Sequence, residues 1–134
     1  MPLLTGVVKR ALIVAFILAV CSCGRYLEKT LDSPVIEGGT VVFRVKCPSA
    51  RTVQLAGDWE GNNWAQGDAE AGEVLVGLME KAGQEGVWEL TMRLAPGRYR
   101  YRFLVDETTW FLDVENPRVV DDGRGGKANL LIVP

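Results

Sequence analysis

Tryptophan and arginine are the residue types in this sequence whose chemistry best suits ligand recognition. A tryptophan offers a flat apolar face, and the guanidinium of Arg102 is a planar fork of donors able to serve two neighbouring hydroxyls. A sugar ring has apolar C–H faces and a rim of hydroxyls, so a sugar receptor needs both kinds of group. Trp64 ends a loop and Trp110 begins a strand, positions that permit exposure, although sequence position alone leaves core and surface equally open for both.

Other chemistry is less well supported. The sequence has no histidine, and so lacks the usual general base and the commonest metal ligand. The acidic turn 121–123, with Asp113 and Glu115 nearby, would suit a hard cation such as calcium, but its spacing matches no EF-hand loop. Glycoside hydrolysis needs two carboxyl groups held across a cleft, which a small sandwich rarely forms. We therefore expect no catalytic residue, no metal and no cofactor.

Length and charge limit the partners. The 134 residues leave room for one domain, and the formal net charge is −2. Lysine and arginine are spread along the chain, so we expect no nucleic-acid partner.

The N-terminal segment indicates export. Lys9 and Arg10 precede the apolar run 11–20, which is shorter than the about 20 residues that a membrane-spanning helix needs. A cysteine after such a run, preceded by small residues, resembles the lipobox of bacterial lipoproteins. Cys23 is the expected lipidated residue and Cys21 the alternative. An ordinary signal peptide or a short uncleaved anchor is the competing interpretation.

This pattern predicts a protein secreted across the inner membrane and lipid-anchored in the cell envelope, facing the periplasm or the surface. We expect the chain to be divided into a lipoprotein signal peptide over residues 1–22, a spacer over 23–39 and a folded domain over 40–134.

Alternating apolar and polar residues predict short antiparallel strands. The clearest lies between Pro96 and Asp106: its aromatic residues and Val105 share the inward face, and three arginines share the outer face. A turn then leads to a partner strand at 110–112. The other expected strands are 40–47, 52–56, 74–79, 87–94, 119–120 and 128–133. Stretch 74–79 also suits a helical turn, and strand is favoured because its neighbours are strands. About seven strands without a strong helix predict an all-β, antiparallel β-sandwich, with Cys47, Trp59 and Trp88 in its core.

Several short motifs then occur in the order of a known family. They are Val42-Phe43-Arg44, Leu55-Ala56-Gly57-Asp58-Trp59, Asn62-Asn63-Trp64, Gly86-Val87-Trp88-Glu89, the stretch 96–106, Trp110, Asp113, Asn116-Pro117 and the stretch 121–126. In this order the chain resembles the glycogen-binding domain of the AMP-activated protein kinase β subunit, and the early-set domain at the front of isoamylases and branching enzymes. The resemblance covers about residues 40–134. It implies an immunoglobulin-like (early-set) sandwich that binds α-1,4-glucans on an open face.

The resemblance also implies the site. Two tryptophans that stack on glucose rings correspond to Trp64 and Trp110, and the basic residue of the central strand corresponds to Arg102. The family's last-loop asparagine falls on Ala128, with Asn129 one residue late, so Asn129 is the expected contact. The sequence departs from the family by two extra residues before Asn-Asn-Trp, one extra residue in the turn before Trp110, and a longer connection from Trp64 to Trp88.

Two functions are compatible with these features. The first is a non-catalytic carbohydrate-binding module for glycogen, starch or maltooligosaccharides, carried on a membrane-anchored lipoprotein. In the family such domains often contact a catalytic barrel, so an enzyme partner here would be a separate glycan-active polypeptide. The alternative is a structural or protein-interaction sandwich that does not bind sugar.

Overall fold

The structure is a computed structural model that describes residues 31–67 and 75–134. The expected signal peptide, with Cys21 and the lipidation candidate Cys23, lies outside the described residues. In the part of the chain that is described, no helix is long and apolar enough to span a membrane.

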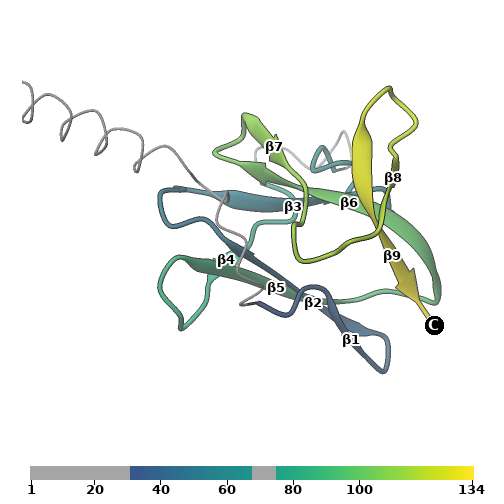
Figure 1. Cartoon of the computed structure of the whole chain (residues 1–134), viewed down its shortest axis with the longest axis horizontal. Coiled ribbons are helices and arrows are strands. Elements are labelled where there is room, and N and C mark those ends of the chain that lie inside the picture. The colour runs from purple at the N-terminus through teal and green to yellow at the C-terminus, as the bar shows by residue number, and fades with distance from the viewer. Residues whose placement is uncertain (1–30, 68–74) are drawn as a thin grey trace, which may run out of the picture.

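Two antiparallel sheets pack as layers, which confirms the predicted β-sandwich (Figure 1). The first sheet has the order β1-β2-β5-β4, built from β1 (Val35–Glu37), β2 (Thr40–Lys46), β5 (Val87–Arg93) and β4 (Glu80–Lys81). The second has the order β3-β6-β9-β8, with β7 also paired to β6. Its strands are β3 (Val53–Gly57), β6 (Gly97–Val105), β9 (Lys127–Val133), β8 (Val119–Asp121) and β7 (Thr109–Phe111).

Strand β6 is the centre of the second sheet, as the sequence predicts. One of its edges pairs with β3, and its other edge pairs first with β9 and then with β7. Tyr101, Phe103 and Val105 are buried between the sheets, so the alternate residues Arg98, Arg100 and Arg102 belong to the outer face. The outer face of β6 therefore carries a row of cations beside the loop that follows β3 and the loop that joins β8 to β9.

The core lies between the sheets and is rich in aromatic side chains. The Phe43 ring stacks near Trp59, with centroids 6.2 Å apart, and meets the Tyr101 ring edge-on at 5.0 Å. The Trp88 indole N–H donates to the carbonyl oxygen of Cys47 at 3.0 Å. The predicted core positions of Trp59, Trp88 and Cys47 are confirmed, because all three are buried.

Two expectations about the elements are wrong. The sandwich begins before residue 40: β1 pairs with β2, so the last part of the expected spacer belongs to the fold. Residues 75–79 form a turn with one isolated bridge, between Leu78 and Gln54, in place of the described part of the expected strand 74–79. Gly77 explains the turn, since its φ is +70° and a Cβ there would collide with the Leu55 carbonyl.

Candidate functional site

The candidate site is a tryptophan–arginine cluster, formed by Trp64, Arg102 and Trp110 on the outer face of the second sheet. Arg102 lies opposite Ala56 across the β3–β6 ladder. Ala56, Ala128 and Trp64 form a small buried cluster separate from the sandwich core. Because alanines stand on this part of the sheet, there is room above them for an indole ring.

The Arg102 guanidinium lies near both indoles. Its Cζ is 5.1 Å from the centroid of the Trp64 ring and 4.9 Å from that of the Trp110 ring. Both distances are within the range of cation–π attraction. The expectation that three residues from distant parts of the chain meet on one face is therefore met in the structure.

The two indoles differ in exposure. Trp110 exposes 44% of its surface, whereas Trp64 exposes only 8%. The family resemblance led us to expect two rings open to solvent, and the structure offers one. Trp64 packs on Ala56, Ala65 and Ala128, so its ring acts as a wall behind Arg102.

Trp64 is held in place by the Asn62 side chain, which ties the loop to strand β3. The Asn62 side chain accepts hydrogen bonds from the N–H groups of Gly57 and Ala65, and donates to the Leu55 carbonyl. Three successive residues, 63–65, have φ between 44° and 65°, a left-handed conformation that costs non-glycine residues free energy. Asn62 was recognised in the sequence only as part of a motif. Asparagine side chains often hydrogen-bond the backbone of a turn, and this tendency is the sequence signal that Asn62 positions the loop that carries Trp64.

Trp110 is positioned by the β6–β7 hairpin. It lies opposite Leu104, and the three-residue turn 106–108 has positive φ at its first two positions, Asp106 and Glu107. The Asp106 carboxylate accepts the N–H groups of Arg51 and Thr52. These two bonds, that of Thr52 above all, lower the pKa of Asp106 below its ordinary value. The hairpin, and with it the exposed indole, is thereby tied to the β2–β3 connection.

Asn129 does not reach the surface, which corrects the expected sugar contact. Its side chain is fully buried. The amide accepts the Asp113 N–H at 2.7 Å and donates to the carbonyls of Asp113 and Asn116. Tyr101 is opposite Asn129 and faces inward, so Asn129 shares that inner face. With its groups satisfied by the loop after β7, Asn129 has a structural role.

Asn129 belongs to a buried polar network that joins the two sheets. The Asp113 carboxylate accepts hydrogen bonds from the hydroxyls of Ser33 and Tyr101, at 2.9 and 2.7 Å. Asn116 also donates to the Tyr101 oxygen. Burial raises the pKa of Asp113, and burial followed by the Asp113 charge raises the pKa of Tyr101. The network fixes the β7–β8 connection against β6 and the segment before β1.

The acidic turn does not assemble as a cation site. Asp113 points into the interior network, whereas one oxygen of Asp122 accepts the N–H groups of Arg124 and Gly126. Within residues 31–67 and 75–134, no group of three or more acidic or cysteine side chains has a metal-binding arrangement.

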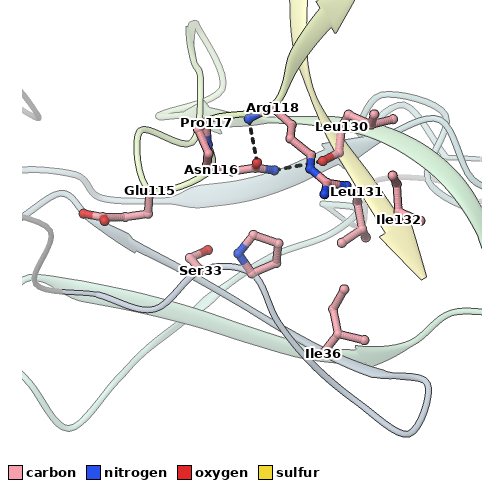
Figure 2. Close-up of a pocket in the computed structure, with 10 residues that line it drawn as sticks. Ser33, Ile36, Glu115, Asn116, Pro117, Arg118, Leu130, Leu131 and Ile132 are labelled. Atoms are coloured by element: carbon pink, nitrogen blue, oxygen red, sulfur yellow. Dashed lines mark hydrogen bonds between the residues drawn. The ribbon is translucent and has the colours of Figure 1, made fainter. Parts of the chain in front are cut away.

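A groove lies elsewhere, where β1 faces β9 and the β7–β8 connection (Figure 2). Ile36, Leu131 and Ile132 supply apolar walls. Its polar edge is already engaged, because the Asn116 amide donates to the Leu130 carbonyl and accepts the Arg118 N–H, the two bonds drawn in Figure 2. None of the residues of the tryptophan–arginine cluster lines this groove.

Comparison with known proteins agrees with the architecture. A family model described as the glycogen recognition site of AMP-activated protein kinase matches residues 40–134. A search of curated proteins found no match. Among solved structures, the chain is similar to pullulanase from Bacillus acidopullulyticus, with a TM-score of 0.51 and 19% identity. That similarity covers 83% of this chain and 12% of the pullulanase chain, so it concerns a small part of that protein and shows a shared fold.

Proposed function

Because the chain belongs to the family of the glycogen recognition site of AMP-activated protein kinase, we propose that it is a non-catalytic module that binds α-1,4-glucans such as glycogen, starch or maltooligosaccharides. The single observation that carries the proposal is the open Trp110 indole beside the Arg102 guanidinium. A glucose ring stacked on Trp110 would place its hydroxyls near the donors of Arg102. With one exposed ring, binding is expected to be weak.

The exposure of Trp110 supports a role in binding rather than in folding. Trp110 lies on a strand of only three residues, and its solvent-facing indole contributes little to the core. Stability of the fold therefore gives no reason for a large apolar ring to be exposed at this position. Arg102 is less exposed, at 21% of its side chain, and its guanidinium lies over the Trp64 ring. The pair thus combines an apolar surface with fixed donors, the requirement for holding a sugar ring.

Titration with maltoheptaose, followed by tryptophan fluorescence and by retention on amylose, tests the proposal. Trp110→Ala should lower the affinity by about tenfold or more, since stacking against an aromatic ring and its hydrophobic contact are both lost. Val119→Ala is the matched control, because Val119 is an equally exposed apolar residue on β8. An unchanged affinity in Trp110→Ala would contradict the proposed site. Release of reducing ends from amylose would contradict the non-catalytic role.

A second candidate is a protein-interaction sandwich that does not bind sugar. The observation that favours it is the 8% exposure of Trp64, together with the ion pair that already engages Arg102. A wild-type chain that gives no fluorescence change with maltoheptaose and no retention on amylose would support this candidate.

We also propose that the chain is exported and anchored through a lipid on Cys23, near a separate glycan-active enzyme. The support is the basic residues, the short apolar run and the cysteine at the N-terminus. Such an anchor would place a weak glucan-binding face at a membrane surface, where many copies together retain a long polysaccharide.

A further inference from the structure

We propose that Asp122 is a positioning residue, which holds the Arg102 guanidinium between the two indoles so that its donors face the ligand. The proposal rests on the proposed glucan-binding function for its ligand, and on the geometry around Asp122 for its mechanism. Asp122 would not itself touch the sugar, because only 5% of its side chain is exposed.

The Asp122 carboxylate is fixed by its own turn. Its Oδ1 accepts the N–H of Arg124 at 2.7 Å and the N–H of Gly126 at 3.0 Å. The Asp122 N–H donates to the Gly126 carbonyl at 3.1 Å, which closes the turn. With Oδ1 engaged twice, Oδ2 is left toward Arg102, and it lies 3.4 Å from Nη2.

Arg102 needs such an anchor. An arginine side chain has many rotamers, and stacking on an indole face constrains its distance more than its direction. Among the described residues, Asp122 supplies the only ion pair of Arg102, and the buried Nε of Arg102 has no hydrogen-bond partner. The carboxylate therefore selects one orientation of the guanidinium between Trp64 and Trp110.

Gly126 provides the space for this contact. A Cβ at position 126 would lie 2.7 Å from Oδ2 of Asp122 and 3.6 Å from Nη1 of Arg102. A side chain there would push the carboxylate away from the guanidinium. The hydrogen bonds from the N–H groups of Arg124 and Gly126, and then the Arg102 charge, keep the pKa of Asp122 below its usual range. The Asp122 side chain is therefore a negatively charged carboxylate at neutral pH.

The neighbouring residue offers a matched control. Asp121 has the same charge, but its side chain is 82% exposed and pairs with Lys127 at 2.7 Å, away from the indoles. Asp122→Asn keeps an oxygen for the two backbone N–H groups and removes the charge opposite Arg102. Asp121→Asn removes an equal charge one residue away.

The experiment compares maltoheptaose affinity in full-length wild type, Asp122→Asn, Asp121→Asn and Gly126→Ala. Asp122→Asn and Gly126→Ala should weaken binding by about two- to fivefold, the scale of one partly exposed ion pair, and Asp121→Asn should match wild type. In an Arg102→Met background, Asp122→Asn should have no further effect, because Asp122 acts through Arg102. A purely structural role would give the same loss in both backgrounds.

A second measurement needs no ligand. The tryptophan emission and near-ultraviolet circular dichroism should change in Asp122→Asn, not change in Asp121→Asn, and not change further when Asp122→Asn is added to Arg102→Met. If wild type fails to bind glucan, the proposed function fails, and this spectroscopic cycle still decides the positioning role. The positioning role is overturned if Asp122→Asn matches Asp121→Asn in both measurements, or if its effect persists without Arg102.

Discussion

At the scale of single residues, burial separates side chains of the same type into different roles. Trp110 and Trp64 both contact Arg102, yet one is open and the other covered. Asn62 and Asn129 are both buried amides with three hydrogen bonds each, so each serves the backbone. The residue type alone therefore does not show whether a tryptophan or an asparagine could contact a sugar; the neighbours of the side chain decide whether it is exposed.

Trp64 should matter for stability more than for contact with the ligand. Trp64→Ala removes a buried ring that packs on Ala56 and Ala128, so it should lower the free energy of unfolding by about 3 kcal/mol. Trp110→Ala should change that free energy by no more than about 0.5 kcal/mol, because the ring is exposed. Urea unfolding followed by far-ultraviolet circular dichroism measures both. Full stability in Trp64→Ala together with lost glucan binding would instead make Trp64 a ligand platform.

At the scale of elements, the buried network couples strand β6, the β7–β8 connection and the segment before β1. Tyr101, Asn116 and Ser33 come from these three parts, and all of them bond to one another or to Asp113. Such a network is stable only while every member is satisfied. The network therefore links strand β6, which carries Arg102, to the segment that precedes β1 of the first sheet.

The stability of the fold should depend on the charge of Asp113. Its pKa is raised above the ordinary value of 3.8 by burial, so the folded state binds the proton more tightly than the unfolded state. The stability contributed by this proton is present below the unfolded pKa, and it is lost as the pH rises through the raised folded pKa. Asp106 and Asp122 have lowered pKa values and act in the opposite sense, below 3.8.

Unfolding by urea at a series of pH values tests this assignment. Above pH 3.8, the free energy of unfolding of wild type should contain a component that falls with rising pH, and Asp113→Asn should lack it. The control is Asp121→Asn, whose side chain is exposed and which should keep the wild-type slope. An Asp113→Asn variant with an unchanged slope would show that another group titrates in this range.

At the scale of the whole molecule, the sandwich extends beyond the segment that carries the family motifs. Strand β1 pairs with β2, and Ser33 bonds to Asp113 across 80 residues of sequence. Ile36 packs against the core from the same segment. The N-terminal connection is therefore a structural part of the domain up to Ser33.

Truncation tests this extension. A chain that begins at residue 40 should be less stable than one that begins at residue 31, by about 2–4 kcal/mol, because it loses Ile36 from the core and leaves Asp113 without the Ser33 donor. Thermal unfolding and urea unfolding of the two chains give the difference. Equal stability of the two chains would contradict this prediction and would mean that β1 and Ser33 do not stabilise the domain.

The proposed anchor makes a prediction for the complete protein in a bacterial host. Wild type should appear in the membrane fraction and incorporate labelled fatty acid, and Cys23→Ser should lose both. Cys21→Ser is the control, because it removes the neighbouring thiol and should keep both properties. Loss of the label only in Cys21→Ser would move the lipid to Cys21, and its absence from wild type would favour an ordinary signal peptide.

The amino-acid sequence alone predicts the sandwich and its central strand, and the structure confirms both. The period of two in 97–105 is a local property, and it assigns Tyr101 and Phe103 to the core and Arg102 to the outer face without knowledge of any partner. It also marked Trp59 and Trp88 as core residues. The sequence does not predict β1, because three residues between turns show too little alternation. It wrongly favours a strand over 74–79, because an apolar run of six residues has no period that distinguishes a strand from a turn.

Which of these groups face solvent depends on contacts that only the folded chain makes. The exposure of Trp64 depends on alanines from two other strands, and the orientation of Arg102 depends on a carboxylate 20 residues away in the chain. Likewise, Asn129 and its neighbour Ala128 face opposite sides of the sheet, which follows from the place of Asn129 opposite the inward-facing Tyr101. Such contacts join residues distant in sequence, so no local pattern records them.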